Sequence, residues 1–124
     1  MKIRILDSSI RLRLDRAEVD RIGAGESVTA TTEFPNGAQF TYALAASEAA
    51  APTASFEAGC MTVWVPREEA HEWATDETRV GIHTSQAVKA GELKLLIEKD
   101  FECLDPREGE DQSNRFVNPK ATTA

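Results

Sequence analysis

Four cationic side chains lie in two short alternating stretches at the start of the chain, and they could bind a negatively charged group. Lys2 and Arg4 alternate with apolar residues in the first stretch, as Arg11 and Arg13 do in the second. The guanidinium of arginine is planar and presents a fork of N–H donors that matches the oxygens of a carboxylate or a phosphate. These residues therefore predict an anion-binding or interaction surface.

Two strands must position these cations. Residues 2–6 and residues 10–14 alternate apolar and charged side chains with the period of a β-strand. Asp7 and Ser8 between them favour a turn, so the two strands most simply form a hairpin with all the cations on one face. Because like charges opposite each other destabilise a sheet, we expect something negative to lie over them.

The sequence leaves three possibilities for this basic stripe. The acidic segment 105–111 folds back over it, a phosphate or similar anion binds to it, or the face is solvated with nothing bound. Residues 1–21 hold six cations and four carboxylates, a net charge of +2, and residues 98–111 hold two cations and seven carboxylates, a net charge of −5. This opposition favours the first possibility.

Trp64 is a second candidate for an interaction surface. It alternates with Met61, Val63 and Val65, so its side chain is expected on the opposite face of a strand from theirs. The other large aromatic side chains are expected in the core, namely Phe34, Phe40, Tyr42, Phe56 and Trp73.

The histidines and cysteines match no known site. His71 and His83 have no metal-ligand spacing and are expected to be structural or solvent-facing, although a nucleophile pair of His83 with Cys60 or Cys103 stays open. The acidic residues near Cys103 follow no recognised metal-binding pattern. We therefore predict no catalytic residue, no metal and no cofactor.

A stretch similar to residues 9–22 returns 51 positions later at residues 60–73. Each copy predicts a strand that runs directly into a short helix. Asp15 and Glu18 have the spacing of a helix capping box, and Pro66 suits the first turn of the second helix.

Other alternating stretches complete a β-β-α-β-β order that occurs twice, with residues 45–53 as the connection. Short turns between consecutive strands favour antiparallel pairing, and many such strands tend to curl or close. The predicted fold is α+β: a bent antiparallel sheet or open barrel of about eight strands with two short helices and an approximate internal two-fold. Residues 1–111 would form one domain, followed by an extended or mobile tail at residues 112–124.

Composition limits the class of protein. A chain of 124 residues with 41% apolar residues can bury one core. We expect a cytoplasmic protein with reduced cysteines, because neither a signal peptide nor a membrane-spanning run is recognisable and the cysteines number only two. The net charge of −7 argues against nucleic acid as a partner.

Three stretches together resemble a family of short, uncharacterised bacterial proteins that carry a domain of unknown function: MKIRILDSSIRLRLDRAEVDRI, MTVWVPREEAHEWA and LKLLIEKDFECLDPREGEDQSNRFVNP. The last is the most specific. The resemblance implies one bacterial domain and no catalytic residue. The middle stretch also looks like the strand-proline-helix of swapped-hairpin DNA-binding antitoxins and transition-state regulators. That likeness covers about a third of the chain, and the acidic balance argues against it.

The sequence thus predicts a small non-enzymatic binding or protein-interaction module, monomeric or a small homo-oligomer, with no membrane or nucleic-acid partner. Its candidate residues are Lys2, Arg4, Arg11, Arg13 and Trp64. The alternative is a barrel or enzyme that binds a small anion such as a phosphate or nucleotide. A pocket lined by Arg11 or Arg13 would favour the alternative, and a covered, neutralised stripe would favour the module.

Overall fold

The computed structural model describes residues 1–101 and contains eight strands and two helices. The elements are β1 (Lys2–Leu6), β2 (Ser9–Leu14), α1 (Arg16–Gly23), β3 (Val28–Glu33), β4 (Gln39–Ser47), β5 (Thr53–Glu57), β6 (Cys60–Pro66), α2 (Arg67–Thr75), β7 (Gly81–Val88) and β8 (Gly91–Lys99). The predicted α+β class and the β-β-α-β-β order are confirmed. The boundary of the predicted domain at residue 111 lies outside the described residues.

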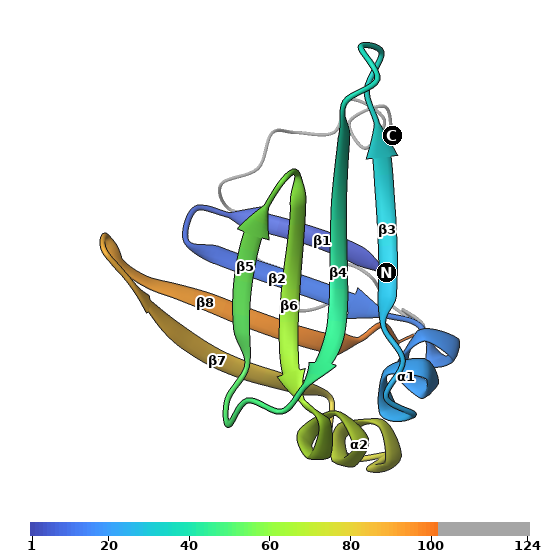
Figure 1. The fold of residues 1–124 in the computed structure, drawn as a ribbon. Helices are drawn as coiled ribbons and strands as arrows, with labels where there is room; N and C mark the ends of the chain where they lie inside the picture. The colour runs from blue at the N-terminus through green and yellow to red at the C-terminus, as the bar shows by residue number, and fades with distance from the viewer. Residues whose placement is uncertain (102–124) are drawn as a thin grey trace, which may run out of the picture.

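The strands form two four-stranded sheets that cross each other, as Figure 1 shows. Sheet A has the order β1-β2-β8-β7, and sheet B has the order β3-β4-β6-β5. In each sheet two antiparallel hairpins meet through a parallel inner pair, β2 with β8 and β4 with β6. The sheets are therefore mixed and separate, where we expected one antiparallel sheet or open barrel. Alternation in the sequence indicates which face a side chain takes but not which strand lies beside it.

Each sheet combines a hairpin from the first half of the chain with a hairpin from the second. Sheet A holds β1-β2 and β7-β8, whereas sheet B holds β3-β4 and β5-β6. The parallel pairing of β2 with β8 brings Ser9 level with Lys94 and Leu14 level with Lys99. The halves thus interlock, and the first hairpin lies beside the last strand.

The core lies between the two sheets and beneath the helices, which contact each other at one corner of the molecule (Figure 1). Residues of the two similar stretches occupy matching buried positions: Leu12 and Val63, Leu14 and Val65, Val19 and Ala70, Ile22 and Trp73. Trp73 is fully buried, and its indole Nε1 donates a hydrogen bond to the carbonyl of Val80 at 3.1 Å. The pattern that suggested two similar halves therefore coincides with the interior.

The two helices begin differently. The backbone N–H of Glu18 donates to the Asp15 carboxylate at 2.9 Å, and the backbone N–H of Asp15 donates to the Glu18 carboxylate at 3.0 Å, so the predicted capping box is confirmed. Glu18 also pairs with the N-terminal ammonium of Met1. In the second helix Pro66 has an extended backbone and is the N-cap rather than part of the first turn, and it provides no side-chain cap.

Two aromatic residues expected in the core are exposed. Phe34 is 51% exposed in the turn after β3, and Phe56 is 63% exposed on the edge strand β5, where it stacks on Phe40. Edge strands and turns have neighbours on fewer sides, which the period of the sequence does not reveal. Strand β4 also extends to Ser47, so part of the predicted connection is strand.

Candidate interaction surface

The hairpin brings the four predicted cations together on the outward side of sheet A. Lys2 lies opposite Arg13 and Arg4 lies opposite Arg11 in the antiparallel register, while the alternate residues Leu12 and Leu14 are buried on the other side. Because β8 runs parallel beside β2, Lys94 aligns with Ser9 and joins the same side. We call the outward side of sheet A with these cations the basic face: Lys2, Arg4, Arg11, Arg13 and Lys94.

Carboxylates at the end of β8 neutralise part of the basic face. The Arg11 Nε atom lies 3.1 Å from a carboxylate oxygen of Glu98, and the Lys2 ammonium lies 2.8 Å from that of Asp100. Within residues 1–101, Arg4, Arg13 and Lys94 form no ion pair. The segment 105–111, expected to cover these cations, lies outside the described residues.

The basic face also lowers the pKa of the Asp100 carboxyl group, which lies beside it. The hydrogen bond from Lys2 holds the pKa of Asp100 below its usual range. Partial desolvation opposes this shift, while the positive charges of Lys2, Arg13 and the N-terminus add to it. Asp100 is therefore ionised at neutral pH, and its lowered pKa reflects the positive charges around it.

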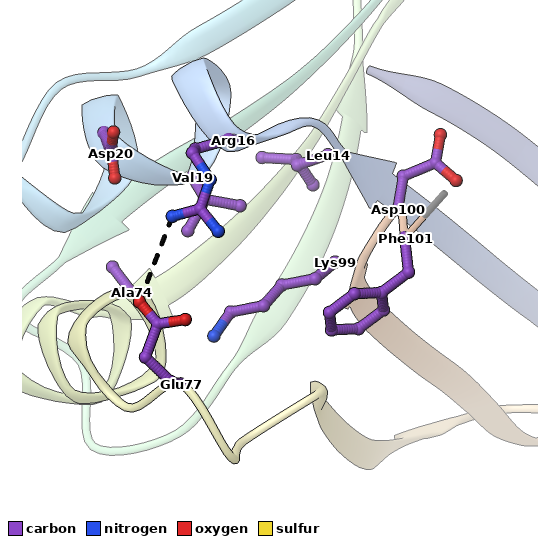
Figure 2. A pocket seen from close by; sticks show the side chains of 9 residues that line it. All are labelled: Leu14, Arg16, Val19, Asp20, Ala74, Glu77, Lys99, Asp100 and Phe101. Atoms are coloured by element: carbon purple, nitrogen blue, oxygen red, sulfur yellow. Dashed lines mark ion pairs between the residues drawn. The ribbon is translucent and has the colours of Figure 1, made fainter. Parts of the chain in front are cut away.

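A cavity of about 350 Å³ lies between the helices and the end of β8, and Figure 2 shows the side chains around it. Arg16 and Lys99 contribute positive charge there, but each has a partner. The Arg16 guanidinium lies 3.9 Å from a carboxylate oxygen of Glu77, and the Lys99 ammonium donates to the carbonyl of Asp76 at 2.9 Å. Neither Arg11 nor Arg13 lines this cavity.

A second, more open cavity of about 440 Å³ lies where the end of α1 meets the start of α2. Its lining includes Arg67 and His71, and the imidazole Nδ1 of His71 lies 3.3 Å from the carbonyl oxygen of Gly23. His71 is exposed on the polar side of its helix, as expected. Neither cavity therefore collects the predicted arginines.

Trp64 does not join the cations. It lies on the outward side of sheet B, opposite to Met61, Val63 and Val65, and remains 37% exposed. Its indole N–H donates to the hydroxyl of Ser55 at 3.3 Å. The structure therefore places Trp64 and the basic face on different sheets.

The pair of Cys60 with His83 is not formed. Cys60 is a free thiol on the outward side of sheet B, whereas His83 lies on the outward side of sheet A, 3.5 Å from Glu98. Cys103 lies outside the described residues. Among residues 1–101 no group of three or more His, Cys, Asp and Glu side chains could hold a metal ion.

Sequence reasoning missed the contribution of β8 to the surface. Lys94, Leu96 and Glu98 alternate with buried Leu95 and Ile97, so their shared face could be read from the sequence. Their position beside Arg11 and Arg13 depends on the parallel pairing of β2 with β8, which no local pattern indicates.

The model of a family of unknown function matches residues 1–120, which include every described strand and helix. The chain belongs to this family, DUF7009. The resemblance seen in the sequence is thus confirmed at the level of the family. No curated protein and no solved structure matches the chain. Neither helix of this DUF7009 member within residues 1–101 has the length and apolar character needed to cross a membrane.

Proposed function

We propose that this DUF7009 member is a protein-interaction module of the bacterial cytoplasm and that its basic face binds an acidic segment of a partner protein. One observation carries the proposal: five cations lie on one sheet face, and only two of them are paired within residues 1–101. Arg4 and Arg11 face each other directly. Such like-charged neighbours gain stability when an anion lies between them.

The spacing of the cations suits an extended peptide. The Lys2–Arg13 and Arg4–Arg11 pairs are two residues apart along the hairpin, about 7 Å. Alternate side chains of an extended peptide have the same spacing, so two of its carboxylates could meet both pairs. Leu96, half-buried between Arg11 and His83, offers an apolar contact in the middle of the face.

The distribution of charge favours a protein segment over nucleic acid. Glu92 and Glu98 lie on the same side of the sheet as the cations, and Asp100 lies beside them. Carboxylates among the cations would repel a continuous phosphate backbone, and the whole chain has a net charge of −7. An acidic peptide can instead place its charges at chosen positions.

Small-anion binding is the second candidate, and the cavity of about 350 Å³ is the place for it. Arg16 and Lys99 already have partners, however, and Asp20 and Asp100 add negative charge to the lining. An anion there would have to displace Glu77 or compete with these carboxylates. The open basic face is therefore the better-supported site.

Fluorescence anisotropy tests the proposal by measuring how tightly the full chain binds a labelled peptide. The peptide has ten residues, is rich in glutamate and contains two leucines. Replacing two cations of the face together, Arg4→Gln and Arg13→Gln, should weaken binding about fivefold, because each exposed ion pair contributes about 0.5 kcal/mol. Arg67→Gln removes one positive charge from helix α2, away from the face. It is therefore the matched control for the change in net charge that each single replacement on the face causes.

The opposite change gives a gain of binding. Glu98→Gln removes a carboxylate from the basic face and should strengthen binding, whereas Glu57→Gln removes one from the end of sheet B and should have little effect. Equal effects of Glu98→Gln and Glu57→Gln would mean that net charge alone governs binding, and the proposed site would be wrong.

A further inference from the structure

We infer that the acidic segment 102–111 of the same chain occupies the basic face when no partner is bound, so that a partner must displace it. This inference rests on the proposed function, because it assigns a competitor to the same face. It is supported by where the described chain ends, by the charge of the segment and by its length.

The described chain ends beside the basic face. The backbone N–H of Asp100 donates to the carbonyl of Leu14 at 2.9 Å, which continues the pairing of β8 with β2. The carboxylate of Asp100 then pairs with Lys2 at 2.8 Å. In Figure 2 the side chains of Asp100 and Phe101 point in different directions, that of Phe101 toward Lys99 in the cavity. The described chain therefore ends beside Lys2, within range of the charge of Arg13.

The charge of the segment complements the face. Residues 102–111 hold five carboxylates and one arginine, a net charge of −4. The face has three cations without an ion pair in residues 1–101, and Asp100 already shows that a carboxylate binds at its near end. An acidic chain that continued past Asp100 would meet Arg13 first, then Arg4 and Arg11.

The segment is long enough to cover the face. Its ten residues span about 33 Å when extended, whereas the five residues of β1 span about 17 Å. Because the segment is tethered, its effective concentration at the face is in the millimolar range, so weak exposed ion pairs are sufficient for occupancy. If the segment leaves the face free about a tenth of the time, an external peptide binds about tenfold more weakly than it would to a face that is always free.

Disulfide trapping tests the position of the segment in the full chain. In a Cys60→Ser, Cys103→Ser background, Gly109→Cys is combined with Ser9→Cys on the basic face or with Thr62→Cys on the outward side of sheet B. We expect the disulfide with position 9 to form at least about tenfold faster than that with position 62, and 1 M salt to remove the difference. Equal rates, or a preference that salt does not change, would overturn the inference. Circular dichroism checks that each variant is folded.

Neutralising the segment separates this inference from the proposed function. The variant Asp105→Asn, Glu108→Gln, Glu110→Gln, Asp111→Asn should lose the preference for position 9 and bind the glutamate-rich peptide about tenfold more tightly than the native chain. Unchanged peptide affinity would reject the segment as a competitor and leave the proposed function standing. If neither the native chain nor this variant binds the peptide, the proposed function is rejected. The disulfide-trapping result still decides where the segment lies.

Discussion

The outward sides of the two sheets differ although the sheets have equivalent strand orders. Sheet A presents the basic face, in which Arg4 lies opposite Arg11. Sheet B presents uncharged pairs on its outward side, such as Thr31 opposite Thr41, with their hydroxyl oxygens 3.0 Å apart. The inward sides are alike, since both are apolar and buried. The fold therefore depends on the inward positions, and any difference in what the two sheets bind must come from the outward ones.

The largest effects are expected from substitutions at matching positions of the interior that the two halves share. Leu44 on β4 and Leu95 on β8 are 51 residues apart, and both are almost completely buried. We expect Leu44→Ala and Leu95→Ala each to lower the free energy of unfolding by about 2–5 kcal/mol, measured by urea denaturation. A cost below about 1 kcal/mol for one of them would mean that the two halves do not share the interior equally.

The helix starts should differ in a smaller and one-sided way. Asp15→Ala removes the side-chain cap of α1 and should cost about 1 kcal/mol, whereas Asp15→Asn should cost little because asparagine caps equally well. The matching position, Pro66, has no such bond to lose. Equal destabilisation by Asp15→Ala and Asp15→Asn in the same urea experiment would show that the cap is not the cause.

The outward sides should respond to substitution with opposite signs. In the variant whose segment 102–111 is neutralised, Arg4→Thr relieves the repulsion with Arg11 and should stabilise the protein by about 0.3 kcal/mol at low salt, with no gain in 1 M salt. Thr31→Ala removes the hydroxyl contact with Thr41 and should destabilise by about 0.5 kcal/mol at either salt concentration. Destabilisation by Arg4→Thr at low salt in that variant would contradict the repulsion between Arg4 and Arg11.

The smallest expected effect is on one carboxylate. In Lys2→Met the pKa of Asp100 should rise toward its usual value, while the pKa of Asp76, lowered mainly by hydrogen bonds from Thr78, should stay low. Because the folded pKa of Asp100 is depressed, its contribution to stability is present above about pH 4 and is lost as the pH falls through the folded pKa. Carboxyl NMR titration measures both groups, and a low pKa of Asp100 in Lys2→Met would contradict the assigned cause.

Much of the fold could be predicted because its signals are local. The alternation in β1 and β2, the capping box at Asp15 and the strand that runs into a short helix in residues 9–22 and in residues 60–73 all depend on neighbours in sequence. The sheet order could not be predicted, because it depends on which hairpins pack together in three dimensions. The four cations were assigned to one face correctly because they lie on a local hairpin. Their neighbours Lys94 and Glu98 were missed because they reach this face through the pairing of β2 with β8.

The most direct test of the central claim is to map where an acidic peptide binds, by two-dimensional NMR of the full chain with an excess of the glutamate-rich peptide. We expect the amide shifts to concentrate on β1, β2 and β8 and to disappear in 1 M salt. Shifts centred on the strands around Trp64, or on the cavity between Arg16 and Lys99, would contradict this claim.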